Sequence, residues 1–166
     1  MKTGRQRLNI KVIQPEYPNE GTSDSAIRCL AWMLDALEKA GRDSDLILLP
    51  EYANVPGIGD RDRMLEFALS GGVEMLEQVA RCAAHLESWV AVGAAVLDGS
   101  QWVNRTILFD RGGGQWYGYD KVHLTEVEDE GLGFTAGPVP GLTSLEGTRV
   151  GFATCFDVYF PEYFSA

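Results

Sequence analysis

The sequence has only three cysteines and two histidines. These low counts argue against a disulfide-stabilised domain and against a zinc protein. Its three cysteines, Cys29, Cys82 and Cys155, include no pair at C-x-x-C spacing. An odd count in a chain of this length argues against the disulfide framework that holds small secreted domains together. Its two histidines, His85 and His123, are too few and too far apart for a zinc site. We therefore expect no metal ion and no cofactor.

Basic side chains are also scarce, and no part of the chain stays apolar for long. The 14 Lys and Arg residues face 24 Asp and Glu residues, which gives a net charge of −10 at pH 7. A surface of that sign repels phosphates, so neither nucleic acid nor an anionic membrane is an expected partner. No apolar run approaches the roughly 20 residues of a membrane span, and residues 8–13 are too few for the apolar part of a secretory signal. The expected location is the reducing cytoplasm.

What is present is enough apolar sequence to fold one domain. Hydrophobic residues make up 45% of the 166 positions. A chain of that size buries about 70% of the surface that it exposes when unfolded. No repeat, linker or low-complexity tract divides the sequence, so we predict a single domain over residues 1–166.

The apolar pattern predicts strands that first alternate with helices and then follow one another. Leu30, Leu34 and Leu37 recur with Ile27 at helical spacing, and Val73 belongs to a second amphipathic pattern. The predicted elements are a strand over 8–14, a helix that Ser23 or Asp24 caps and Gly41 ends, a strand over 45–50, helices over 62–69 and 73–83, strands over 89–97, 103–109 and 115–119, and a hairpin of 142–145 and 149–154. This order is typical of an α/β or α+β domain with helices packed on a mixed sheet.

Three side chains with useful chemistry follow apolar strands at the point where each strand ends. They are Glu51, Lys121 and Cys155. Each has an ordinary explanation when taken alone: a solvated loop carboxylate, a surface lysine and a small core hydrophobe. Strand ends at one edge of a sheet are where α/β folds assemble their sites, so the joint appearance of the three favours a functional site.

The three side chains fit one kind of chemistry. A thiol with an ordinary pKa of about 8.5 needs a base or a positive field to act as a nucleophile. A glutamate such as Glu51 can take the thiol proton and later deliver it to a leaving amine. An ammonium such as that of Lys121 can stabilise an oxyanion, helped by the backbone N–H that follows Cys155. A redox-sensing thiol is a weaker alternative, because it leaves Glu51 and Lys121 unexplained.

At these residues the chain resembles the nitrilase, or carbon–nitrogen hydrolase, superfamily. The matching segments are Leu-Leu-Pro-Glu-Tyr at 48–52, Tyr-Asp-Lys-Val-His-Leu at 119–124 and Cys-Phe-Asp-Val-Tyr-Phe-Pro-Glu at 155–162, in the order that the family has them. The strand at 9–14 and Phe-Thr-Ala-Gly at 134–137 fit as well. The resemblance covers essentially the whole chain and implies an αββα sandwich, which in this family commonly forms dimers through its helices.

The resemblance also implies roles for particular residues. It makes Glu51 the general base, Lys121 the partner of the oxyanion and Cys155 the nucleophile, with the Phe156 backbone N–H as a second oxyanion donor. The implied activity is hydrolysis of a non-peptide C–N bond in a small amide, through a thioester on the cysteine. Nitrile and N-carbamoyl hydrolysis are the nearest alternatives.

A second glutamate is expected in the long irregular segment 122–140, which is a candidate site loop because of its length. In the family this residue lies four positions before the phenylalanine of an F-x-x-G turn, which here selects Glu130. Glu126, Glu128 and Asp129 are close enough in sequence to leave the choice open, and a solvated acidic loop is the ordinary interpretation.

Four further residues flank the three motifs and are candidates for lining the pocket: Tyr52, Asn54, Asp157 and Tyr159. The sequence does not indicate what they would bind beyond a small amide or nitrile substrate.

The chain departs from the family in length. Family domains continue well beyond the cysteine, whereas only residues 156–166 follow it here. We therefore expect the C-terminal part of the sandwich to be missing and apolar strand faces to lie exposed. A complete domain would be a homo-oligomer. The main alternative to an enzyme is an inactive remnant that acts as an interaction module.

Overall fold

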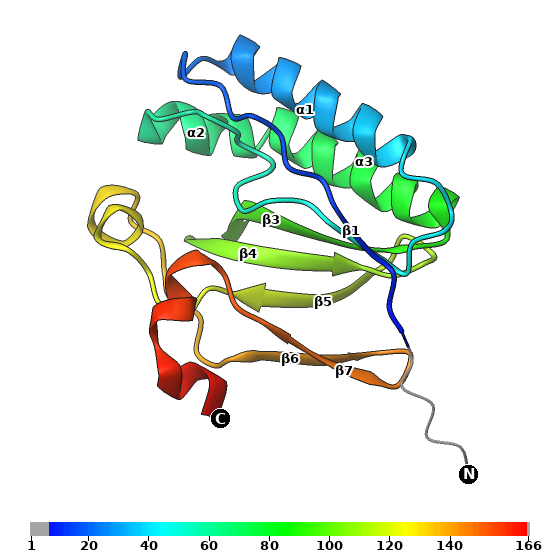
Figure 1. Ribbon diagram of the computed structural model, residues 1–166. Helices are drawn as coiled ribbons and strands as arrows, with labels where there is room; N and C mark the ends of the chain where they lie inside the picture. Colours follow the sequence, from blue (N-terminus) through cyan, green and yellow to red (C-terminus); the bar gives the residue numbers. More distant parts are fainter. Residues whose placement is uncertain (1–6, 166) are drawn as a thin grey trace.

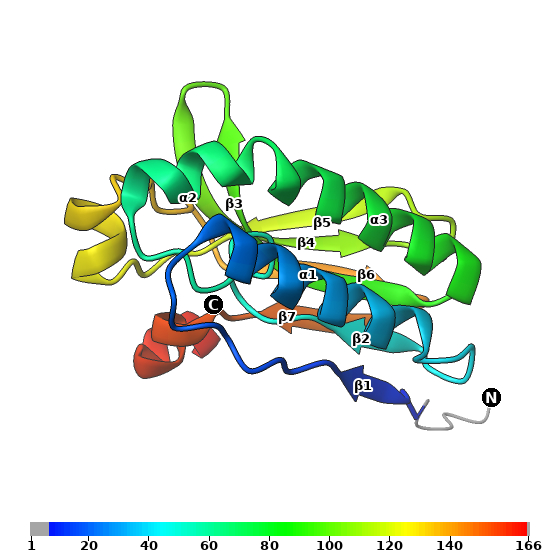
Figure 2. The same cartoon turned by 90° about the horizontal axis from the view of Figure 1, so that it is seen from above.

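The structure, a computed structural model, describes residues 7–165. Three helices lie over a five-stranded sheet, and a two-stranded hairpin covers part of the opposite face (Figures 1 and 2). The elements are β1 (Ile10–Val12), α1 (Ser23–Glu38), β2 (Leu46–Leu48), α2 (Arg61–Ala68), α3 (Gly71–Leu86), β3 (Trp89–Asp98), β4 (Gln101–Phe109), β5 (Gln115–Asp120), the π-helical turn η1 (Val127–Gly131), β6 (Gly141–Leu145), β7 (Thr148–Phe152), and the 3₁₀ turns η2 (Cys155–Tyr159) and η3 (Pro161–Ser165).

The large sheet is mixed, as the sequence predicts, and its strand directions determine where the site forms. Its order is β1-β2-β3-β4-β5. The first three strands run parallel, whereas β4 is antiparallel to both β3 and β5. β5 therefore runs in the same direction as β2, and the carboxyl ends of these two strands lie at one edge of the sheet. Glu51 and Lys121 follow those two ends.

The hairpin β6–β7 packs on the face of the sheet that the helices leave open. Leu145 is buried there, with Val150 and Phe152 partly buried beside it. Their partners on the large sheet are Leu46, Trp89, Ala91 and Leu108. This contact holds β7 against the sheet, and η2, which begins with Cys155, follows β7 after only two residues.

The helical layer covers the other face, with one correction at the start of α1. The helix is capped by Thr22 and not by Ser23 or Asp24, because the Thr22 hydroxyl accepts a hydrogen bond from the Ser25 N–H at 3.2 Å. Apolar residues lie on two sides of α1, and Ile27 is 52% exposed although it belongs to the predicted apolar stripe. The residues of α1 that face the core are Ser25, Ala26, Cys29, Leu30, Met33 and Leu37.

Several large apolar side chains near the hairpin and at the edge strand β1 are exposed. They are Ile10, Val12, Leu142, Val158, Tyr159 and Phe164. Within residues 7–165, no helix combines the length and apolar character that crossing a membrane requires.

Candidate active site

Glu51 is held at the sheet edge by contacts of its backbone. After β2 the chain turns through Pro50, whose carbonyl accepts a hydrogen bond from the Gly93 N–H at 3.1 Å. A Cβ atom at position 93 would lie only 2.6 Å from the Glu51 Cα, so glycine is needed where β3 passes this turn. The Tyr17 hydroxyl donates to the Glu51 carbonyl at 2.7 Å. These contacts fix the backbone of Glu51 next to β3.

Lys121 lies at the centre of the site and is 1% exposed. Its backbone N–H donates to the Asn104 carbonyl at 2.9 Å, which aligns it with β4. Its Nζ donates to Glu51 Oε1 at 3.0 Å and to Glu128 Oε2 at 2.7 Å. Burial alone lowers the pKa of Lys121, but its hydrogen bonds to Glu128 and Glu51 outweigh burial and raise it. The side chain is therefore a buried ammonium shared by two carboxylates.

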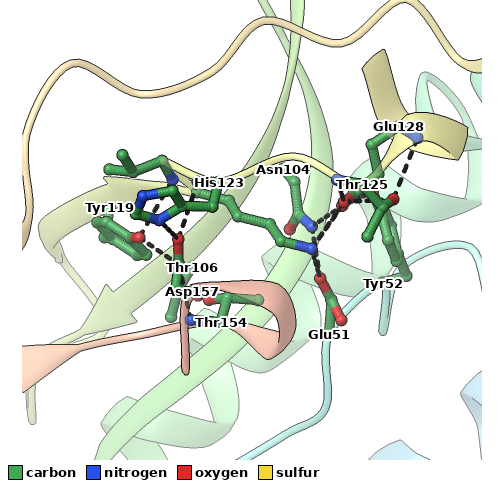
Figure 3. A network of polar contacts seen from close by, with 12 residues as sticks. Glu51, Tyr52, Asn104, Thr106, Tyr119, His123, Thr125, Glu128, Thr154 and Asp157 are labelled. Carbon is green, nitrogen blue, oxygen red and sulfur yellow. Dashed lines mark hydrogen bonds and ion pairs between the residues drawn. The ribbon is translucent and has the colours of Figure 1, made fainter. Parts of the chain in front are cut away.

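Glu128 is the more buried of those two carboxylates (Figure 3). Its Oε2 accepts from the Thr125 N–H and hydroxyl, both at 2.9 Å, and its Oε1 accepts from the Tyr52 hydroxyl at 2.7 Å. Burial raises the pKa of Glu128, but the hydrogen bond from Lys121 and those from Thr125, Tyr52 and Asn104 outweigh it and lower the pKa to about 2. The carboxylate is thus held ionised.

The structure places Glu128 in the site, and not Glu130, which the sequence selects as the second glutamate. Glu130 and Asp129 are exposed on η1, and Glu126 is exposed just before it, whereas Glu128 is 4% exposed and points into the site. The reason is the π-helical turn, which has more residues per turn than an α-helix and changes which side chain faces inward. The Glu128 carbonyl also accepts from the Phe134 N–H at 2.9 Å, which sets the position of the turn.

Asn104 is a site residue that the sequence analysis did not identify. It lies on β4 and is buried, and its Nδ2 donates to Glu51 Oε1 at 2.6 Å and to Glu128 Oε1 at 2.7 Å. Its Oδ1 is buried and has no hydrogen-bond partner within residues 7–165. One amide thus ties the two carboxylates together. β4 also carries Gln101, Arg105 and Thr106, so its sequence pattern does not single out Asn104.

Cys155 lies at the first position of η2, beside the same end of the sheet. It is exposed and adopts a left-handed backbone conformation with φ of 48°, which is uncommon for a residue with a Cβ atom. With Glu51 and Thr106 it lines an open cavity of about 380 Å³. Partial burial and then the negative charge of Glu51 raise the pKa of Cys155, and Lys121 opposes them. The resting sulfur is therefore a thiol close to a carboxylate.

Asp157 connects the cysteine turn to the segment that carries Lys121 (Figure 3). Its buried carboxylate accepts from the Thr154 N–H at 2.9 Å, the Tyr119 hydroxyl at 2.5 Å and the His123 N–H at 2.9 Å, and His123 Nδ1 lies 2.9 Å away. Burial raises the pKa of Asp157, but these hydrogen bonds outweigh it and lower the pKa. Thr154 precedes Cys155, and Tyr119 and His123 flank Lys121, so this carboxylate joins two segments of the site.

The remaining predicted pocket residues have different positions. Tyr52 lies in the site and donates to Glu128. Asn54 is buried away from the cavity, where its amide makes two 2.9 Å hydrogen bonds with the Ala95 backbone, because it connects the loop to β3. Tyr159 is exposed at the surface, and Phe156 lies beside it with ring centroids 5.8 Å apart. Asn54, Asp157 and Tyr159 are not among the residues that line the cavity with Cys155.

Comparison with known proteins gives the chain a family context. A family model described as carbon–nitrogen hydrolase matches residues 12–166. A 2-oxoglutaramate amidase from Bacillus subtilis (strain 168) is 28% identical, with 76% of this chain and 49% of the relative covered. A second, from Paenarthrobacter nicotinovorans, is 25% identical, with 96% and 56% covered. The chain therefore spans about half the length of these curated relatives.

Solved structures show the same fold. An amidase from Nesterenkonia sp. superimposes with a TM-score of 0.74 at 21% identity, over 94% of this chain and 58% of that one. The NitFhit protein of C. elegans also gives 0.74, at 22% identity, over 93% and 39%. At such identities the likeness is one of fold, and it agrees with the layered α/β architecture described above.

Proposed function

The chain belongs to the carbon–nitrogen hydrolase family, and from that premise we propose that its site hydrolyses small amides through a thioester on Cys155. One observation supports this most strongly. Glu51 and Lys121, which follow two strands of the same direction, are joined at 3.0 Å, and Glu51 lines one cavity with Cys155. These contacts support a site in which a nucleophile, a base and a fixed cation act together, as acyl transfer requires.

In the proposed reaction, the Cys155 sulfur attacks the amide carbonyl carbon and its proton passes to Glu51. The carbonyl oxygen becomes an oxyanion, which the Lys121 ammonium and the Phe156 backbone N–H stabilise. Glu51 returns the proton to the nitrogen, the C–N bond breaks, and ammonia or an amine leaves a thioester behind. Water then attacks the thioester and gives one proton to Glu51, which passes it to the departing sulfur. The carboxylic acid is released and the thiol is restored.

The two glutamates lie in unequal environments, which supports different roles for them in the proposed reaction. Glu128 is buried, and its hydrogen bonds keep its pKa at about 2, so it stays ionised and neutralises Lys121. Glu51 is more exposed, at 25% of its side chain against 5% for Glu128, and it faces the cavity. We therefore assign proton transfer to Glu51. Glu128 takes the place of Glu130 as the second glutamate, in the role of anchoring the ammonium.

The proposed substrate class is a small amide. The two curated relatives are both 2-oxoglutaramate amidases, and the cavity wall near Cys155 combines Leu46, Leu48, Ala91 and Val150 with the polar groups of Glu51 and Thr106. Such a wall accommodates a short chain beside a reactive carbonyl. Nitriles and N-carbamoyl compounds, which present an electrophilic carbon of similar size, are the alternatives to compare.

Ammonia release and intact-mass spectrometry test the proposal. The chain is incubated with a panel of short amides, nitriles and N-carbamoyl compounds, and the protein is then quenched in acid. We expect ammonia from amides and an acyl adduct on Cys155, both absent in Cys155→Ala. Glu51→Gln is expected to lose turnover by about 10²-fold or more, as an essential proton-transfer group does. Near-normal turnover in Glu51→Gln would remove the general-base role.

The exposed thiol favours one second candidate, a chain that keeps the site without turnover and acts as an interaction module. Cys155 is exposed, and its pKa is raised. In that case neither ammonia nor an acyl adduct forms, while iodoacetamide still alkylates Cys155 faster than the buried Cys29 and Cys82. Alkylation therefore separates a folded but inactive chain from a misfolded one, in which all three thiols react alike.

A further inference from the structure

A groove lies in the helical layer, which Figure 1 shows across the sheet from the hairpin that leads to Cys155. It has a volume of about 360 Å³ and lies between α1 and α3, with α2 contributing at one end. Its lining residues from α1 are Ile27, Leu30, Ala31, Leu34, Asp35 and Glu38, and those from α2 and α3 are Phe67, Gly71, Glu74, Met75 and Gln78. None of them belongs to the proposed active site.

The groove explains why α1 is apolar on two sides. Ala26, Met33 and Leu37 are fully buried toward the sheet. Ile27 and Leu34 instead line the groove, and Ile27 remains 52% exposed. Single exposed apolar residues need no explanation, but apolar residues aligned along one groove above a floor of buried side chains indicate a contact surface.

The shape of the groove fits a helix. Its α1 wall extends from Ile27 to Glu38, which corresponds to about 16 Å, or three helical turns. The lining positions of α1 and α3 recur three and four residues apart, so each helix presents one continuous stripe. An amphipathic helix lying between two such stripes buries its apolar residues in the manner of helix-in-groove recognition.

The charged residues at the rim of the groove indicate the charge that a partner helix needs. Asp35, Glu38 and Glu74 are the charged lining residues, and no Lys or Arg lines the groove. Asp35 pairs with Lys39 at 2.7 Å, but within residues 7–165 neither Glu38 nor Glu74 has an ion-pair partner. A second copy of this chain, with its net charge of −10, would bring acidic rims together. We propose that the groove binds an amphipathic helix of a partner protein that carries Lys or Arg on both sides of its apolar stripe.

Fluorescence anisotropy with labelled model peptides tests the proposal on the chain as it is. The probes are a 14-residue Leu/Lys helix and a Leu/Glu helix of the same pattern. We expect the Leu/Lys peptide to bind and the Leu/Glu peptide not to bind. The double variant Glu38→Lys with Glu74→Lys is expected to weaken Leu/Lys binding by about tenfold or more and to gain binding of the Leu/Glu peptide.

A matched pair of substitutions outside the groove controls for overall charge. Glu66→Lys with Glu77→Lys changes the net charge equally at exposed positions that do not line the groove, and we expect it to leave binding nearly unchanged. Ile27→Ser, at an exposed site, is expected to weaken binding without loss of helical circular dichroism. The proposal is overturned if both double variants weaken binding equally, if Ile27→Ser binds as well as the parent chain, or if the protein self-associates through the groove.

Discussion

Glu128 and Asp157 are both buried carboxylates with several hydrogen bonds and a lowered pKa, yet they are surrounded by different partners. Glu128 lies against a buried ammonium, that of Lys121, and shares it with Glu51. Asp157 instead collects two backbone N–H groups, a tyrosine hydroxyl and a histidine ring. The first arrangement concentrates charge where a proton is proposed to move, and the second joins chain segments.

The difference shows that this fold uses one buried carboxylate beside the proposed chemistry and another to hold chain segments in place. A buried ion pair loses much hydration and is weak support for stability, so its presence in a core calls for another reason. A carboxylate that accepts donors from several chain segments fixes the geometry between those segments. Perturbing each carboxylate should therefore have distinguishable effects on turnover, on stability and on the geometry around Cys155.

The largest effect is expected from breaking the charged cluster at Lys121. Lys121→Met leaves two carboxylates without their cation, one of them fully buried, and is expected to lower the free energy of unfolding by about 3–5 kcal/mol and turnover by about 10²-fold or more. Urea denaturation and ammonia release measure the two effects. Adding Glu128→Gln should restore part of the stability without restoring turnover.

The exposed Lys39, which pairs with Asp35 at 2.7 Å, offers a matched control. Lys39→Met is expected to change stability by about 1 kcal/mol or less, as surface pairs do. If Lys121→Met is no more harmful than Lys39→Met, the buried cluster does not have the electrostatic role assigned to it.

A smaller effect is expected from the junction at Asp157. Asp157→Asn keeps one acceptor oxygen but turns an NH₂ group toward donors, which should cost about 1–3 kcal/mol of unfolding free energy. Because Thr154 precedes Cys155, the variant should also change the rate at which iodoacetamide alkylates Cys155, at every pH tested. Asp129→Asn, at an exposed position, is the control. An unchanged alkylation rate in a destabilised Asp157→Asn chain would limit this residue to a structural role.

Gly93→Ala sharpens the comparison, because it disturbs the position of Glu51 without altering a charge. The added Cβ would meet the Glu51 Cα at 2.6 Å, and relief of such overpacking costs about 1–3 kcal/mol. We expect the loss in turnover, expressed as an activation free energy, to exceed the loss in unfolding free energy, since the shifted atom belongs to the proposed base. Gly59→Ala, where an added Cβ meets nothing within 4 Å, should be neutral. Equal behaviour of the two variants would contradict the role given to Gly93.

The last effect is a pH dependence of stability, which leaves turnover at neutral pH untouched. The pKa of Glu128 is about 2 in the folded chain against an ordinary 4.5, so its contribution is present above about pH 4.5 and is lost as the pH falls toward 2. Glu128→Gln should flatten the fall of unfolding free energy over that range, and Asp157→Asn should flatten it separately. Glu130→Gln, at an exposed position, should follow the parent chain; if it flattens the curve instead, the second glutamate is misplaced.

Periodicity and motif order predicted much of this molecule. Every predicted strand and helix is found, because alternation and helical spacing report burial directly. Glu51 and Lys121 were expected together because they follow strands, and the parallel directions of β2 and β5 bring them to one edge. The family assignment and the α/β class are confirmed. The cytoplasmic location and the homo-oligomeric assembly stay predictions.

The rest depended on contacts that a one-dimensional pattern does not contain. Glu130 was chosen by counting back from Phe134, and the π-helical turn places Glu128 inward instead. Asn104 is a site residue only because β4 lies between the segment that carries Glu51 and the segment that carries Glu128. Asp157 was expected in the pocket, but it joins segments 38 residues apart, from Tyr119 to its own turn. Such pairings are decided by tertiary packing.

The backbone conformation and the proposed chemistry require different amino acids at position 155. A φ of 48° suits glycine, and a residue with a Cβ atom adopts it at a cost of about 1 kcal/mol or more. The turn is therefore locally frustrated: the amino acid that the backbone prefers lacks the sulfur that the proposed chemistry uses. Selection for folding alone would drift toward glycine here. A population of variants sorted for stability and one sorted for catalysis should accordingly diverge at this codon.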